Sequence, residues 1–113
     1  MSDPTVVVSF KDTPHSEKVR QDVEARCAHL ALEFPETTRF EVTLTADGLG
    51  FSAHGHVTGR DTEVAGHAAG EHLGEAADRM LAKLERALRK VHDKKIFNSR
   101  REARKAGNKR HGA

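Results

Sequence analysis

Two neighbouring segments of alternating residues constrain the fold of this chain most. Residues 39–46 (RFEVTLTA) and 51–58 (FSAHGHVT) switch between apolar and polar side chains, as half-buried β-strands do. The inward side chains are Phe40, Val42 and Leu44 in the first segment and Phe51, Ala53 and Val57 in the second. The sequence DGLG at 47–50 separates the two segments and is typical of a hairpin turn. We therefore predict a hairpin with one buried face, and the opposite face exposes Glu41, Thr43, His54 and His56.

Further strands are predicted on either side of this hairpin. Residues 5–10 (TVVVSF) form a short β-branched run, which favours a strand. Residues 59–61 (GRD) form a second turn after the hairpin. Residues 62–68 (TEVAGHA) then predict a weaker fourth strand, whose inward side the pattern leaves open.

A first helix is predicted between the first strand and the hairpin. Thr13 is a suitable N-cap, and Pro14 suits the first helical position because no hydrogen bond is lost there. Apolar residues then recur in steps of three and four, at Val19, Val23, Cys27, Leu30 and Phe34. Pro35 is expected to end the helix, since a proline disfavours the helical conformation of the residue before it.

A second helix is predicted from near Glu71 to about Lys95. Its apolar residues form one stripe: Leu73, Ala76, Ala77, Met80, Leu81, Leu84, Leu88 and Val91. After Phe97 the sequence becomes polar, contains two glycines and loses the apolar period. We therefore divide the chain into a domain at 1–96 and a basic, flexible tail at 97–113, which we expect to be disordered when free.

The order of these elements predicts an α+β fold, β-α-β-β-β-α. The strand-helix-strand unit at the start implies a right-handed crossover, so the first two strands should be parallel. The two following connections are hairpins. Because each helix has one apolar stripe and the sheet has one apolar face, we expect a four-stranded mixed sheet with two helices packed on one face.

Composition restricts the class of protein. A chain of 113 residues allows one small domain with a tail, and no apolar run approaches the length of a membrane span. The first ten residues lack a signal-peptide pattern, and the single cysteine, Cys27, forms no internal disulfide. We therefore expect a cytoplasmic protein.

Charge is distributed unevenly along the chain. Residues 94–113 hold eight basic residues and one acidic residue, a net charge of +7. The other 93 residues hold 11 basic and 16 acidic residues, a net charge of −5. An acidic body with a basic tail is common in proteins that meet nucleic acid, although a merely solubilising tail would look the same.

Charges also segregate on the second helix. At 3.6 residues per turn, one set of basic residues falls within roughly 220° to 300° of Leu73 around the axis. These residues are Arg79, Lys83, Arg86, Lys90 and Lys94. The other flank carries Glu75, Asp78, Glu85 and Arg89. A row of one sign forgoes the stabilising pairs of opposite charge at i,i+4 and can follow a phosphate backbone. The row alone leaves a solvated face and a polyanion site equally open.

Other chemistry finds less support. The sequence has no Trp or Tyr, and four of its five Phe fall on inward positions, which favours phosphate and shape contacts over base stacking.

His54 and His56, with His67 on the next strand, would be candidate zinc ligands, but no acidic residue stands at a standard spacing, so we expect no metal and no cofactor. No phosphate-binding loop or hydrolase motif occurs, and Cys27 falls on an apolar helix face, so we predict no enzyme.

The order of elements, the TP at the first helix and the run DRMLAKLERALRK resemble the short ribosome hibernation-promoting factors, also called ribosome-associated translation inhibitors. The similarity covers about residues 4–95. Its most specific part is KLER at 83–86 followed by LRK at 88–90, with Asp78 before them. The chain departs from the family at Gly74 and Ala77, where an aromatic residue and an isoleucine are usual. No linker or second domain of the long forms is seen in the sequence, so we expect a short form.

The resemblance implies a non-enzymatic factor of stress or stationary phase that takes no small-molecule substrate. Such factors bind the small ribosomal subunit at the decoding centre, contact 16S rRNA and block mRNA and the A- and P-site tRNAs. Lys83, Arg86, Arg89 and Lys90 match the motif, and the basic row adds Arg79 and Lys94. The tail would add Lys95, Arg100, Arg101, Arg104 and Lys105 along an rRNA or mRNA-channel path. The alternatives are a general module for structured RNA and a transcription regulator that binds protein.

Overall fold

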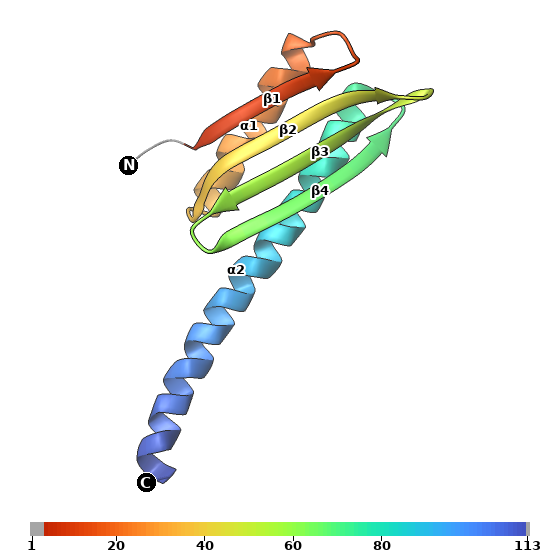
Figure 1. Cartoon of the computed structure of the whole chain (residues 1–113). Coiled ribbons are helices and arrows are strands. Elements are labelled where there is room, and N and C mark those ends of the chain that lie inside the picture. Colours follow the sequence, from red (N-terminus) through yellow and green to blue (C-terminus); the bar gives the residue numbers. More distant parts are fainter. Residues whose placement is uncertain (1–3, 113) are drawn as a thin grey trace.

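The computed structural model describes the backbone of residues 4–112 and the side chains of residues 4–94. The elements are β1 (Thr5–Lys11), α1 (Glu17–Glu33), β2 (Thr37–Asp47), β3 (Gly50–Gly59), β4 (Thr62–Gly70) and α2 (Leu73–Gly112). Both helices cover the same face of the sheet, and the C-terminal part of α2 extends beyond it (Figure 1). The predicted fold class is confirmed.

The sheet is mixed, with the strand order β1-β2-β3-β4. β1 pairs with β2 in parallel, with Val8 opposite Val42, as the crossover through α1 requires. β2 and β3 are antiparallel around the 47–50 turn, where Gly48 has a φ of 64°. A positive φ strains residues with a Cβ, so glycine suits this position. β1 and β4 are therefore the two edge strands.

The core lies between the inner face of the sheet and the two helices. It contains the predicted apolar residues of the hairpin and of both helices, and Phe40, Leu44, Met80, Leu84 and Leu88 are among its largest fully buried side chains. On β4 the structure decides the inward side, because Val64 and Ala68 are buried and His67 is exposed. The opposite face of the sheet is open, as predicted.

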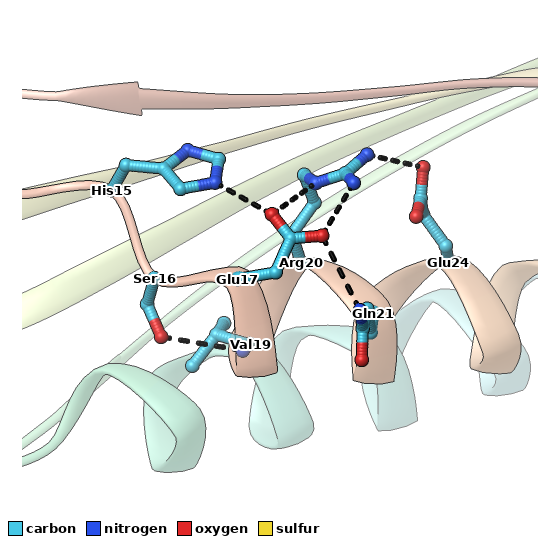
Figure 2. Close-up of polar contacts among 7 residues, drawn as sticks. All are labelled: His15, Ser16, Glu17, Val19, Arg20, Gln21 and Glu24. Carbon is cyan, nitrogen blue, oxygen red and sulfur yellow. Dashed lines mark hydrogen bonds and ion pairs between the residues drawn. The ribbon is translucent and has the colours of Figure 1, made fainter.

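The start of α1 differs from the prediction. Ser16, rather than Thr13, is the N-cap: its Oγ accepts a hydrogen bond from the backbone nitrogen of Val19 at 3.3 Å (Figure 2). Glu17 follows in the first turn and pairs with Arg20. This serine is favoured because it is followed by an acidic residue, which suits the positive end of the helix dipole. The helix ends before Pro35 as expected, with Phe34 as its C-cap.

The predicted end of the second helix is wrong. α2 begins at Leu73 and continues past Lys95 to Gly112. Arg, Ala, Lys and Glu dominate residues 100–106 and are strong helix formers, and no proline interrupts them. The side chains of this segment lie outside the described residues. The division at residue 96 and the flexibility of residues 97–113 stay predictions.

Candidate nucleic-acid interface

The predicted basic row forms one exposed side of α2. Arg79, Lys83, Arg86, Lys90 and Lys94 are all exposed. On the opposite side of the same turns, Met80, Leu84 and Leu88 are buried against the sheet. The apolar contact therefore orients the helix so that the row faces outward.

The first two residues of the row lie over the edge of β4. Arg79 donates from Nη1 to the backbone oxygen of Ala69 at 3.0 Å, and Lys83 donates from Nζ to that of His67 at 2.8 Å. These bonds occupy carbonyl groups at the edge of the sheet, where a strand would otherwise offer them to another chain. Arg79 also lies 3.6 Å from Glu75. Both cations therefore have a structural role within the domain.

The next three residues of the row have a different environment. Among the side chains that the structure describes, Arg86, Lys90 and Lys94 make no hydrogen bond or ion pair. Their charges are compensated by solvent alone within this part of the chain. A polyanion can replace that solvent without breaking any hydrogen bond or ion pair among the described side chains, so these three residues are the best candidates for phosphate binding.

Arg89 does not belong to this row. It forms ion pairs with Glu33 of α1 and, at 3.1 Å, with Glu85 on its own helix. It therefore joins the two helices on the flank that faces α1. Its predicted contact with RNA is not tested by this geometry, but RNA would compete with two carboxylates for it.

The remaining predicted RNA-binding residues are Lys95, Arg100, Arg101, Arg104 and Lys105. Their backbone is part of α2, and their side chains lie outside the described residues. Their role stays a prediction.

The open face of the sheet brings together residues whose contact the sequence only partly revealed. His54 on β3 and His67 on β4 are register partners, and their rings stack with centroids 5.4 Å apart. They line a shallow hollow with His56 and Glu41, above small residues of β3 and β4. The alternation of the sequence placed His54 and His56 on this face. Which side chains of β4 share that face, and therefore where His67 points, was decided only by the tertiary structure.

Neither a metal centre nor a reactive thiol is apparent in the described part of the chain. No group of three histidine, cysteine or acidic residues between positions 4 and 94 is arranged to hold a metal ion. Burial raises the pKa of Cys27 to about 12, so its thiol is protonated at neutral pH. Within the described residues, no helix has the length and apolar character needed to cross a membrane.

Comparison with known proteins identifies the family. Residues 6–96 match the family described as sigma 54 modulation protein / S30EA ribosomal protein. The chain belongs to this family. The match confirms the predicted resemblance and spans both helices up to the middle of α2, including all of the described basic row. Among curated proteins, no sequence matches the chain.

Solved structures show the same fold. A ribosomal subunit interface protein from Coxiella burnetii superposes with a TM-score of 0.73 at 15% identity, over 79% of this chain and 98% of that one. The N-terminal domain of Thermus thermophilus Protein Y superposes with a TM-score of 0.68 at 19% identity, over 80% of this chain and 99% of that one. At 15% and 19% identity, these two structures establish only that the fold is shared. Membership of the family rests on the match of residues 6–96.

Proposed function

We propose that this protein is a ribosome hibernation factor of the cytoplasm that binds the small ribosomal subunit. The family description includes a ribosomal protein, and one structural neighbour is a ribosomal subunit interface protein. The observation that carries the proposal is the exposed cations Arg86, Lys90 and Lys94, which make no ion pair among the described side chains. Three cations on one helix face suit the phosphates of 16S rRNA.

The mechanism we propose is steric. The domain would lie at the decoding centre with α2 against rRNA, in the space of mRNA and of the A- and P-site tRNAs. Inhibition of translation then requires no catalysis, only occupancy. Affinity would come from neutralised phosphates and released counterions, so it should fall steeply as salt rises.

Cosedimentation with purified small subunits tests this proposal. The variant Arg86→Glu/Lys90→Glu reverses two charges that make no hydrogen bond or ion pair within the described part of the domain, and its circular dichroism and melting curve should match wild type. The matched control is Lys11→Glu/Lys18→Glu, which changes the net charge equally at exposed positions on β1 and α1. We expect the first variant to lose cosedimentation and the control to retain it. If the Arg86/Lys90 variant and the control cosedimented equally, the assignment of Arg86 and Lys90 to the ribosome-binding interface would be wrong.

The family description also names sigma 54 modulation, which favours a second candidate function in transcription. A protein partner of that kind would bind with little salt dependence, whereas rRNA binding should weaken strongly with salt. Measuring affinity for small subunits across a range of salt concentrations separates the two. Equal affinity for free duplex RNA and for subunits would instead indicate a general RNA-binding module.

A further inference from the structure

Three histidines on the open face of the sheet have no part in the proposed contact through α2. His54, His56 and His67 line one shallow hollow together with Glu41 and Thr43. Of the small residues that line the hollow, Ala65 places only a methyl group on this face, whereas Gly55 and Gly66 are inward positions where a Cβ would point towards side chains of α2. The helices cover the other face, so this one is open to a ligand (Figure 1).

The geometry of the imidazoles favours an anion. The rings of His54 and His67 are nearly parallel, with an angle of 14° between their planes. Imidazole side chains gain a positive charge between about pH 8 and pH 5. Two such charges on stacked rings repel each other, and an anion in the hollow would relieve that repulsion. His56, on the same strand, has its Nε2 3.1 Å from Glu63.

The other charges on this face nearly cancel. Arg39 pairs with Glu41, and its hydrogen bond lowers the pKa of that carboxyl, which therefore stays ionised. Glu63, beside His56, adds one more negative charge. Lys11 and Asp47, also exposed on this face, cancel each other. With neutral imidazoles the five charged residues therefore sum to −1, and with three protonated imidazoles the sum becomes +2. Protonation therefore changes the sign of the face.

This face is also continuous with the basic row of α2. The Nζ of Lys83 lies 2.8 Å from the backbone oxygen of His67, whose side chain lines the hollow. The basic row thus reaches the edge of β4 at the residue whose imidazole lines the hollow. A phosphate backbone on α2 can follow the same path without crossing an acidic helix face.

We propose that His54 and His67 form a second contact for RNA phosphate groups, one that strengthens on acidification. The choice of RNA as ligand rests on the proposed function; the anion site itself rests on the hollow and the stacked rings. By linkage, phosphate binding and protonation of the imidazoles favour each other. The protein would then hold RNA through α2 at neutral pH and through both surfaces in an acidified cell.

Fluorescence anisotropy with a short labelled single-stranded RNA tests the proposal at about pH 7.5 and about pH 5.5, at constant ionic strength. The variant His54→Gln/His67→Gln removes the two charges and keeps polar side chains of similar size. The control His29→Gln/His72→Gln removes two exposed histidines elsewhere, on α1 and before α2. Both variants therefore lose the same number of imidazole groups. We expect wild type and control to gain about tenfold in affinity on acidification and the His54/His67 variant to lose most of that gain. An equal gain in all three proteins, or no gain in wild type, overturns the proposal.

Two further measurements separate this contact from the proposed function and from a free-phosphate site. At neutral pH, the His54/His67 variant should cosediment with small subunits as wild type does, whereas Arg86→Glu/Lys90→Glu should not. Inorganic phosphate at acid pH, compared with chloride at equal ionic strength, should shift the imidazole NMR signals of His54 and His67. Absence of these shifts overturns the anion site. Shifts without any acid-dependent gain in RNA affinity overturn the RNA contact.

Discussion

Lys83 on α2 donates a hydrogen bond from its Nζ to the backbone oxygen of His67 on β4, at 2.8 Å. This bond joins the basic row of the helix to the edge of the sheet. Within the row, Arg79 and Lys83 bond to β4 and also stabilise the domain, whereas the cations that follow them make no such bond among the described side chains. The same bond places a permanent charge beside the histidine hollow.

Replacing Lys83 should therefore affect stability, and replacing Lys90 should not. Lys83→Gln leaves a β4 carbonyl to solvent, and because the site is exposed we expect a loss of about 0.5 kcal/mol in the free energy of unfolding. Lys90→Gln breaks no contact in the described part of the protein, so its urea midpoint should match wild type. It should instead reduce the slope of log affinity for RNA against log salt by about one. Equal urea midpoints for both variants would contradict the role of the Lys83 bond.

Arg89 is expected to act mainly between the helices. Arg89→Ala removes its pairs with Glu33 and Glu85, and we expect a loss of about 0.5 kcal/mol, because Arg89 is 53% exposed. Urea unfolding in a double-mutant cycle with Glu33→Ala should show a coupling of similar size. A larger loss of RNA affinity in Arg89→Ala than in Lys90→Ala would show that Arg89 belongs to the interface after all.

Gly55 on β3 is required by the packing of α2. A Cβ at this position would meet the sulfur of Met80 and a methyl group of Leu84, both in the core. Gly55→Ala should therefore destabilise the protein by about 1–3 kcal/mol in urea unfolding. The control is Gly74→Ala in the first turn of α2, where a Cβ meets nothing within 4 Å. Because alanine favours helix, this control should be neutral or stabilising by up to about 1 kcal/mol.

The thiol of Cys27 should be unreactive in the folded protein. Burial raises its pKa to about 12, so the protonated form is favoured by folding. The contribution is fully present below the ordinary thiol pKa of 9.0 and is lost as pH rises from there towards about 12. Ellman's reagent at neutral pH should modify Cys27 only in urea. Rapid modification of the native protein would contradict its place in the core.

The start of α1 should weaken in acid. Hydrogen bonds from Arg20 and then His15 lower the pKa of Glu17 to about 2 (Figure 2). A lowered carboxyl pKa contributes stability above the ordinary value of 4.5, and that contribution is lost as pH falls from there towards about 2. Glu17→Gln should therefore show a flatter loss of stability over this range in thermal melts followed by circular dichroism. Asp22→Asn, at an exposed position on the same helix, is the matched control and should keep the wild-type slope.

Sequence patterns determined the order of the elements and most of the core. The alternation around Phe40 and Val42 and the three- and four-residue steps around Leu84 each require one buried face, so only one set of layers could satisfy them. The basic row was also visible, because helical spacing places Lys83, Arg86 and Lys90 on one side without reference to anything else.

What the sequence could not decide are the contacts between elements. The parity of β4 depended on its register with β3, which pairs His54 with His67. The division of the row depended on how far α2 lies from the edge of the sheet, since Lys83 reaches a carbonyl and Lys90 does not. Local periodicity determines which way a side chain points on its own element. Tertiary packing decides which group on another element it meets, and that is what separates a structural cation from one available to RNA.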